Sequence, residues 1–364
     1  MFSRQTPSTE TVLEQLVPEK IKLNMSLPKN QKIFLLSLLG LSSLLYMVVT
    51  LDKFRPAVVP IYPPALSEHT ELCEVNNNIN NSNNSIFFIT PTYPRREQVA
   101  ELTRLSQTLI LAGNVHWIIA EDAPSCSPLV SSILQRSGLP FTHLVSPQPP
   151  MYRKAKLRDN PRGVSSRRAG LHWAMENVEQ GVIYFGDDDN TYDLRLFQQI
   201  AFTRTVSMFP VGFVAAQGVS SPIVQNGRVI GFSDAWFAQR KFPVDMAGFA
   251  INLQFLRQRN PRAATAMPYK AGYEEDLFLQ SLNLTLGDIE PLASDCTEIL
   301  VWHTKTVKDK VTKISLDNED HLQSSSLAML VRHLLDTGIG VISDQGGKQM
   351  RECLDLRKCR TDKS

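Results

Sequence analysis

The sequence lacks an excess of charge of either sign. Its 364 residues include 38 lysines and arginines against 36 aspartates and glutamates, and the formal net charge is +2. No basic stripe with interleaved aromatic residues runs along the chain, so nothing favours nucleic acid as a partner. Cysteine is also scarce: the five cysteines show no metal-ligand spacing and predict no cysteine-based metal site. Apolar residues are not lacking, because 43% of the chain is hydrophobic, which is enough for a large core.

One long apolar run lies near the beginning of the chain. Residues 33–51 are uncharged and mainly apolar, which is long enough to span a bilayer. A cleaved signal peptide is the alternative, but the run begins late and no small-x-small cleavage site follows it. We therefore favour an uncleaved signal anchor. Lysines before the run outnumber the basic residues just after it, which predicts a cytoplasmic tail at 1–32 and a luminal catalytic domain.

A stem is expected between this anchor and the folded part. Residues 52–85 begin with four prolines and continue with a tract that is almost all Asn and Ser, a composition that cannot bury enough apolar surface to fold. The tract holds two N-x-S glycosylation acceptors, Asn80 and Asn83, and Asn283 begins an N-x-T acceptor further on. In a luminal domain all three are candidate glycan sites.

Disulfides are permitted in the lumen, and the odd number of cysteines leaves one thiol over. Cys73 stands alone in the stem, so we expect it to form an inter-chain bridge. Cys353 and Cys359 are close enough in sequence to close a small loop in the tail. Cys126 and Cys296 receive no assignment.

Strand-like and helical segments alternate through the first half of the folded part. Apolar runs predict strands, periodic apolar residues predict helices, and prolines or carboxylates end the strands. The predicted order is a strand in 85–94 that prolines stop, a helix from residue 98, a strand at 116–122, a helix through 130–134, a strand at 141–145, a helix at 163–178 and a strand that ends at Asp187. Such alternation implies right-handed βαβ units and a parallel sheet. Tyr93, Asp122 and 187–189 would then share one sheet edge.

The second half has a different texture. Strand character occurs at 211–219, 228–236, 242–251 and 298–304, and a helix is expected at 274–284. We interpret this half as a mixed sheet packed beside the first. The last sixty or so residues hold one amphipathic helix, at about 322–335.

The most informative motif is the apolar run that ends in Asp187, Asp188 and Asp189. Adjacent carboxylates repel each other, so their accumulation at a strand end suggests a hard divalent cation that also binds a phosphate. A solvated acidic turn is the alternative, although strand ends in open α/β sheets are where ligands bind. A calcium loop is excluded, because Tyr192 and Gln198 stand where that loop requires Gly and Glu. The motif favours a nucleotide-sugar transferase.

Other charged residues fit the same chemistry. Arg162 and Arg167 lie at the beginning of a predicted helix, where guanidinium groups and the helix dipole would act together on an anion, although they could be plain surface arginines. Glu275 lies in an acidic cluster, where neighbouring charge would raise the pKa of a general base; a cluster that only stabilises a helix end is the alternative. His303 and Lys305 could meet phosphate, or the histidine could be structural.

Six short motifs lie along the folded part of the chain in a recognisable order. They are Pro91-Thr92-Tyr93, Glu121-Asp122, Pro161-Arg162-Gly163 with Arg167, Tyr184-Phe185-x-Asp187-Asp188-Asp189-Asn190-Thr191-Tyr192, Phe242-Pro243-Val244-Asp245-Met246-Ala247-Gly248-Phe249-Ala250 and Val301-Trp302-His303-Thr304. Together these motifs resemble the β-1,3-glucuronosyltransferases of animal Golgi membranes. The resemblance runs from Ile86 to about Thr306 in matching order and spacing.

The resemblance implies an α/β GT-A glycosyltransferase fold, with a Rossmann-like UDP-sugar-binding subdomain at 86–189, a mixed-sheet acceptor subdomain at 190–308 and a C-terminal extension at 309–364. It implies Mn²⁺, UDP-glucuronic acid as donor, inverting transfer to the 3-hydroxyl of a terminal galactose, and a homodimer. Carried over by position, Tyr93 would stack on uracil, Asp122 would hold its edge, Arg162 and Arg167 would bind the donor, Asp187 and Asp188 would orient ribose and sugar, and Asp189 would ligate the metal. Glu275 would be the catalytic base, His303 would contact the donor, and Asp245 would bind the acceptor.

Three departures from the family pattern concern the acceptor side more than the donor side. Ser220 stands where the family usually has Glu, Asp276-Leu277 replace two serines, and Lys305 replaces Arg. The acceptor therefore stays open between the proteoglycan linker trisaccharide, an N-acetyllactosamine end and a glycolipid. Two alternative functions remain. One is an enzyme of the same fold that uses a different donor, such as UDP-xylose, and the other is a catalytically silent, membrane-anchored lectin or scaffold.

Overall fold

The computed structural model describes residues 70–76, 84–153, 160–307, 312–315, 326–343 and 348–349. The chain divides into two compact units, Met1–Ile61 and Tyr62–Ser364, and every described residue belongs to the second. The expected anchor at 33–51, both stem glycosylation acceptors and the expected tail disulfide lie outside the described residues. Within those residues, no helix is long and apolar enough to cross a membrane.

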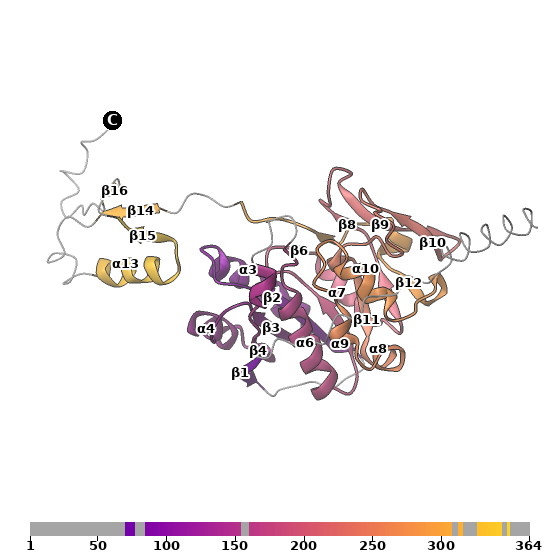
Figure 1. The fold of residues 1–364 in the computed structure, drawn as a ribbon, viewed down its shortest axis with the longest axis horizontal. Helices are drawn as coiled ribbons and strands as arrows, with labels where there is room; N and C mark the ends of the chain where they lie inside the picture. Colours follow the sequence, from indigo (N-terminus) through magenta and orange to yellow (C-terminus); the bar gives the residue numbers. More distant parts are fainter. Residues whose placement is uncertain are drawn as a thin grey trace, which may run out of the picture. The chain divides into compact units, whose positions relative to one another are not determined.

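An eight-stranded mixed sheet forms the centre of this unit, in the order β1-β4-β3-β2-β5-β11-β7-β12 (Figure 1). Its strands are β1 (Glu71–Asn76), β2 (Ile86–Thr92), β3 (Val115–Glu121), β4 (Phe141–Val145), β5 (Val182–Phe185), β7 (Val206–Met208), β11 (Phe249–Asn252) and β12 (Ile289–Pro291). The four strands β4, β3, β2 and β5 are mutually parallel, which confirms the parallel βαβ arrangement expected from the sequence. β1 and β11 border them in the antiparallel sense.

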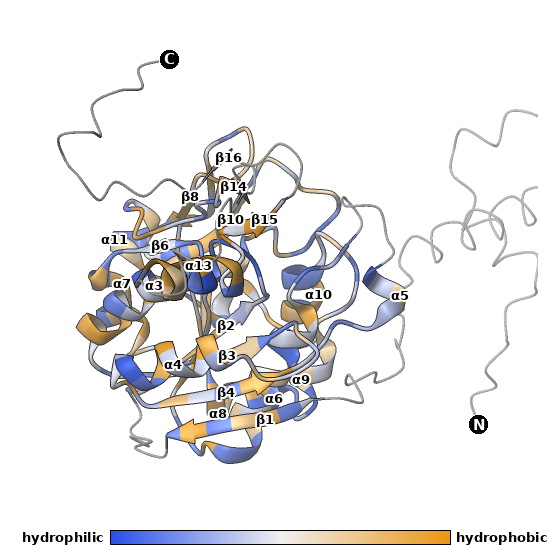
Figure 2. Ribbon diagram, turned by 90° about the vertical axis from the view of Figure 1, so that its left-hand side faces the viewer, coloured by the Kyte–Doolittle hydropathy of each residue, from blue (hydrophilic) through white to orange (hydrophobic). Residues whose placement is uncertain are grey.

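Helices cover both faces of the parallel strands, with α3 and α4 on one side and α6 and α9 on the other (Figure 2). The bounds are α3 (Gln98–Ala112), α4 (Pro128–Ser137), α5 (Pro150–Arg153), α6 (Val164–Asn177), α7 (Leu194–Ile200), α8 (Leu253–Arg259), α9 (Ala263–Ala266), α10 (Glu274–Gln280), α11 (Ala293–Cys296), and the 3-10 helices η2 (Met246–Gly248) and η3 (Leu286–Asp288). The two-residue period of a strand explains the two cores. In β2, Ile86 and Phe88 join the core under α3, whereas Phe87 and Ile89 join the core under α6.

Close packing of α6 on the sheet depends on a glycine. A Cβ at Gly170 would come within 2.6 Å of the Ile89 side chain and 3.3 Å of the Ile118 side chain. Any larger residue would push the helix away from β2 and β3. Because α6 begins just beside the pocket described below, this contact fixes where the beginning of the helix lies.

The strands of the second half do not form one separate sheet. Three of them, β7, β11 and β12, extend the central sheet, and the others form a five-stranded sheet in the order β10-β9-β8-β13-β6. The bounds in this second sheet are β6 (Thr191–Tyr192), β8 (Val211–Gly212), β9 (Val219–Gln225), β10 (Arg228–Ser233) and β13 (Val301–Trp302). The predicted strand at 242–251 was wrong over most of its length: Asp245 caps η2 by accepting a hydrogen bond from Ala247 N at 3.0 Å, and β11 begins only at Phe249.

The part of the C-terminal extension that is described contains α13 (Ser326–Asp336), which confirms the amphipathic helix expected there. It also contains a three-stranded parallel sheet of β14 (Thr312–Ser315), β15 (Gly340–Ile342) and β16 (Lys348–Gln349). The sequence signals did not predict these strands, because they are too short to show a period.

The expectation that Cys73 forms an inter-chain bridge was wrong. Cys73 lies on β1, which pairs with β4 at the edge of the central sheet, and it forms a disulfide with Cys126 in the same chain. The Cα atoms are 5.8 Å apart, within the usual range for such a bridge. Cys296 is a free, partly buried thiol.

Candidate active site

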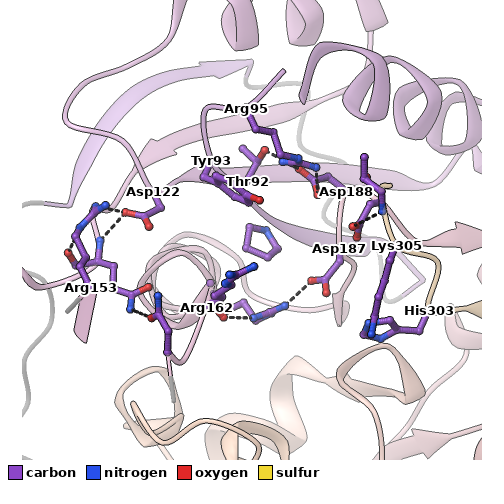
Figure 3. A pocket seen from close by; sticks show the side chains of 17 residues that line it. Thr92, Tyr93, Arg95, Asp122, Arg153, Arg162, Asp187, Asp188, His303 and Lys305 are labelled. Carbon is purple, nitrogen blue, oxygen red and sulfur yellow. Dashed lines mark hydrogen bonds and ion pairs between the residues drawn. The ribbon is translucent and has the colours of Figure 1, made fainter. Parts of the chain in front are cut away.

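A cavity of about 590 Å³ lies where β2, β3 and β5 end. Parallel strands carry their carboxyl ends to the same edge, and this is where open α/β sheets bind ligands. Nine residues singled out from the sequence line the cavity: Tyr93, Asp122, Arg162, Arg167, Asp187, Asp188, Asp189, His303 and Lys305. Figure 3 shows seven of them, labelled, around one space. Residues that are almost one hundred to more than two hundred positions apart in the chain are therefore neighbours here, as the strand order predicted.

The three consecutive aspartates differ in their partners. Asp187 forms an ion pair with Arg167. Asp188 is buried, accepts a hydrogen bond from Thr92 Oγ1 at 2.7 Å and pairs with Arg95 at 2.8 Å. Among the residues that the structure describes, the one hydrogen bond to the Asp189 carboxylate is a long contact of 3.4 Å from the Thr306 backbone N–H. Two of the three charges are thus neutralised by arginines.

Asp189 carries the third carboxyl group, and its surroundings disfavour the ionised form. Burial, and then repulsion by Asp188 and Asp187, raises the pKa of Asp189. Its main chain is nevertheless fixed, because the Asp189 carbonyl accepts hydrogen bonds from Thr304 Oγ1 and from Arg104 at 3.1 Å. A carboxylate with a fixed backbone and an unfavourable anionic form is well placed to accept a cation.

The donor set around Asp189 fits a metal ion that is bound together with its substrate. In the described part of the chain, no group of three His, Cys, Asp or Glu side chains could hold an ion alone. Hard divalent ions such as Mg²⁺ commonly use one or two carboxylates and complete their shell with substrate phosphates and water. Asp189 supplies one such carboxylate on the wall of the cavity. The observed residues therefore fit a metal that enters with a diphosphate rather than a preformed metal cage.

The beginning of α6 forms another wall of the cavity. Gly163, at φ +71°, precedes the helix, and a Cβ there would come within 2.8 Å of Arg167 Nη1 and 3.1 Å of Pro91. The close approach lets Arg167 donate to the Arg162 carbonyl at 3.1 Å while it pairs with Asp187. Arg167 is buried in these contacts, whereas Arg162 is exposed. The sequence analysis gave Arg162 and Arg167 the same role, but their surroundings differ. Arg167 is held by its hydrogen bond and ion pair, whereas Arg162 faces solvent.

The far end of the cavity is built around Asp122, directly after β3. Its Oδ1 accepts the Gln148 backbone N–H at 2.8 Å and pairs with Arg153 from α5. Asp122 and Arg153 lie together at one end of the cavity in Figure 3, away from His303. Tyr93 forms the adjacent wall, and its ring lies under the Arg95 guanidinium at 4.8 Å.

Sequence reasoning missed Arg95 and Arg153. Arg95 had a signal, because it closes the Pro91-Thr92-Tyr93 segment at the end of the first strand, where a basic residue would meet the acidic strand end beside it. Arg153 had none, because it lies in a four-residue helix, 31 positions from its partner Asp122. Only the folded chain reveals that pair.

A second group of ionisable residues includes Asp245 and Glu275, and both interact electrostatically with Arg167. Asp245 Oδ2 accepts a hydrogen bond from His303 Nδ1 at 2.9 Å, and this bond raises the pKa of His303. Burial opposes ionisation of Asp245, but its bond with His303 lowers the pKa of the carboxyl below its usual value. Asp245 itself does not line the cavity; it supports His303, which does.

Glu275 is the second residue of α10 and is partly buried. Burial, and then the charges of Glu274 and Asp245, raises its pKa to about 8, while Arg167 acts in the opposite direction. Glu275 does not line the 590 Å³ cavity either, but it interacts electrostatically with Arg167, which does. A carboxyl with a pKa near neutrality is suited to general-base chemistry.

The glycosylation acceptor in the folded part lies on the surface. Asn283 follows α10, is exposed and adopts φ +49° in a turn. This position is accessible to a glycan, and its modification stays a prediction.

Comparison with known proteins identifies the family. The model of glycosyltransferase family 43 matches residues 105–307. The chain belongs to this family. Galactosylgalactosylxylosylprotein 3-beta-glucuronosyltransferase S of Drosophila melanogaster is 49% identical over 264 residues, which cover 72% of this chain and 63% of that protein. The enzyme named P from the same fly is 50% identical over 62% of this chain and 46% of its own length. Galactosylgalactosylxylosylprotein 3-beta-glucuronosyltransferase 2 of Homo sapiens is 44% identical over 65% of this chain and 72% of its own length.

The family 43 chain thus spans less than two thirds of the length of both fly relatives. Among solved structures, Staphylococcus aureus TarS 1–349 in complex with UDP-GlcNAc matches with a TM-score of 0.38 and 14% identity over 62% of this chain and 60% of that one.

Proposed function

We propose that this protein is a metal-dependent, inverting β-1,3-glucuronosyltransferase with a GT-A fold. It transfers glucuronic acid from UDP-glucuronic acid to the 3-hydroxyl of a terminal galactose. The observation that carries the proposal is the difference within the aspartate triplet. Two of the carboxylates are paired with arginines, whereas the third lines the cavity and forms no ion pair with any residue that the structure describes. Membership of family 43 and the names of the relatives support the same reaction.

The donor would lie along the cavity from Asp122 to His303. The ring of Tyr93 offers a flat apolar face for uracil, and Asp122 offers a carboxylate oxygen to its N–H edge. Arg162 faces solvent on the wall and supplies charge for an anionic part of the donor. His303 and Lys305 lie at the opposite end, where a histidine and a lysine offer N–H donors to phosphate or to the sugar carboxylate.

Mn²⁺ would be held by Asp189, and when bound it would offset the charge that develops on the departing diphosphate. Asp187 and Asp188 would orient the ribose and sugar hydroxyls, with their own positions fixed by Arg167 and Arg95. These roles follow the resemblance, and the observed ion pairs supply the rigidity that such positioning requires.

Glu275 would remove the proton from the acceptor hydroxyl as that oxygen attacks the anomeric carbon. Inversion follows because attack and departure occur on opposite faces of that carbon. The pKa of about 8 makes the carboxylate basic enough to accept a proton and leaves a usable fraction ionised near neutral pH. Asp245 would bind the acceptor while it holds His303 in place.

The acceptor we propose is the galactose end of the proteoglycan linker, because the names of the relatives specify galactosylgalactosylxylosylprotein. We further propose that residues 33–51 anchor the protein as a type II protein of the Golgi membrane, with the catalytic domain in the lumen, and that it acts as a homodimer. The apolar run, the stem composition and the acceptor Asn283 support a luminal location.

The test is UDP release by the purified full chain with UDP-glucuronic acid, Mn²⁺ and a Gal-Gal-Xyl acceptor. We expect release only when all three are present, its loss with EDTA, and its recovery when Mn²⁺ is restored. UDP-xylose in place of the donor, and an N-acetyllactosamine acceptor in place of the linker, test the specificity. Binding of the acceptor without any release would show a lectin or scaffold and would overturn the proposal.

A further inference from the structure

Asp276 is a buried carboxylate that the reaction described above does not use. It follows Glu275 in α10 and is only 1% exposed. Among the described residues, no lysine, arginine or histidine forms an ion pair with it. A buried carboxylate is expensive unless hydrogen bonds satisfy it, so its two partners indicate what it is for.

Both oxygens of Asp276 are satisfied by neutral donors. Oδ1 accepts the backbone N–H of Phe242 at 2.8 Å, and Oδ2 accepts Gln280 Nε2 at 2.7 Å. The Gln280 bond stays within α10. The Phe242 bond joins α10 to a segment 34 positions earlier in the chain.

The segment that begins at Phe242 leads directly to Asp245. The Phe242 ring is buried and packs on Phe232 with centroids 6.0 Å apart, and Val244 N donates to the Phe242 carbonyl at 2.9 Å. The chain then reaches Asp245, which is bonded to His303. A continuous series of short contacts therefore runs from the helix that carries Glu275 to the segment that carries Asp245.

We propose that Asp276 is a positioning residue, whose hydrogen bond to Phe242 holds the Asp245 segment against α10 and so keeps Asp245 and Glu275 close together. This proposal rests on the proposed role of Glu275 as the catalytic base. A carboxylate has two oxygens, so Asp276 accepts from Phe242 on Oδ1 and from Gln280 on Oδ2 at the same time. The side chain therefore links α10 to the Phe242 segment while it keeps its bond within the helix.

The consequence for the base can be stated from its surroundings. The charged groups that face Glu275 are Glu274 on its own helix, Asp245 across the link and Arg167 from α6. If the link is broken, Asp245 moves away and its repulsion of Glu275 weakens, whereas Glu274 stays in place. The acid limb of the pH profile then moves to lower pH, and the acceptor is held less accurately.

The test compares Asp276→Ala with Asp276→Asn in the full chain. Alanine removes the acceptor of the Phe242 N–H, whereas asparagine keeps an oxygen in the same place. We expect Asp276→Ala to lower kcat/KM for the acceptor by about 10- to 100-fold, to move the acid limb to lower pH and to speed hydrogen exchange at the Phe242 amide. Asparagine should restore all three readings most of the way. UDP affinity reports mainly the Tyr93 and Asp122 end of the proposed donor site, so it should change much less than kcat/KM in either variant.

Unchanged kcat/KM and pH profile in a folded Asp276→Ala variant would overturn the proposal, and so would an asparagine variant as impaired as the alanine one. If Asp276→Ala does not fold, Asp276→Ser takes its place, with an intermediate loss expected and a wild-type pH profile contradicting the proposal. Gln280→Leu is the matched control, because it removes the other partner and should leave the acid limb unmoved. An inactive wild-type protein would instead refute the proposed function, and hydrogen exchange at Phe242 would still report whether Asp276 makes the link.

Discussion

Two groups of carboxylates, the aspartate triplet and the group of Glu275 and Asp245, differ in their charged neighbours. On the donor side, Asp187 and Asp188 each have an arginine within ion-pair distance. In the other group, Glu275 is buried and has carboxylate neighbours, and both effects raise its pKa to about 8. An arginine partner holds a carboxylate in place, whereas burial and neighbouring negative charge make a carboxyl hold its proton more tightly. In the proposed mechanism, this difference separates the groups that position the substrate from the group that exchanges a proton.

Arg167 interacts with both groups of carboxylates. It pairs directly with Asp187, and it also lowers the pKa of Glu275 through space. Without that contribution the pKa of Glu275 would be higher still, and less of the base would be ionised at neutral pH. The position of α6, fixed by the close contact of Gly170 with β2, therefore affects donor binding and proton transfer together.

The largest effect should come from Glu275→Gln. Glutamine keeps the shape of the side chain but cannot accept the acceptor's proton, so we expect kcat to fall by about 10²- to 10⁴-fold. The affinity for UDP, measured by isothermal titration calorimetry with Mn²⁺, should stay close to that of the wild type. Turnover equal to that of the wild type would remove Glu275 from the mechanism.

The same variant should be more stable than the wild type near neutral pH. The folded protein holds a proton on Glu275 up to about pH 8, whereas the unfolded chain releases it near 4.5. Between these values the unfolded state binds fewer protons, so stability falls as pH rises. Glutamine does not ionise and escapes this loss. Melting curves at pH 5 and pH 8 should show a Tm gain that is larger at pH 8.

The second prediction concerns pH. If Glu275 must be ionised, kcat/KM should rise with pH, reach half of its maximum near pH 8 and level off about one unit higher, with roughly a tenth of the maximum at pH 7. Glu274→Gln removes the nearest negative neighbour, so the acid limb should move to lower pH. A profile that is flat between pH 6 and 9, or unmoved by the substitution, would contradict the assignment of the limb to Glu275.

The third prediction tests the paired side. Asp188→Asn leaves the Arg95 guanidinium buried without its counter-charge, which should lower the free energy of unfolding by roughly 3–5 kcal/mol. Chemical denaturation measures this loss. The double variant with Arg95→Met removes both charges and should recover much of the stability. Additive losses in the double variant would show that the two side chains are not coupled.

The sequence predicts features that depend on neighbouring residues, and it does not predict contacts between residues far apart in the chain. The parallel order of β2, β3 and β5 brought Tyr93, Asp122 and the aspartates to one edge, because the strand ends are set by local patterns of apolar residues and prolines. The partners of those aspartates were not predictable, because each ion pair depends on side-chain direction across elements far apart in sequence.

The second half was predicted less well for a related reason. Its strands are only two to seven residues long and divide between two sheets, so no period distinguishes one sheet from the other. A strand was expected at 242–251, but Pro243 and the capping residue Asp245 lead into the 3-10 helix η2, which occupies the middle of that range. Cys73 was misassigned because the neighbouring tract of Asn and Ser concealed the six-residue strand β1 that carries it.

The smallest effect should come from Arg153→Gln, and it sharpens the meaning of pairing on the donor side. Arg153 pairs with Asp122 as Arg95 pairs with Asp188, but its side chain is 47% exposed against 7% for Arg95. Water already solvates the exposed guanidinium, so its loss should change the free energy of unfolding by no more than about 1 kcal/mol. Arg95→Gln is the matched control and should cost several times more in the same denaturation experiment. Equal losses would mean that burial does not separate the two pairs, and that the rigidity ascribed to the aspartate triplet has another source.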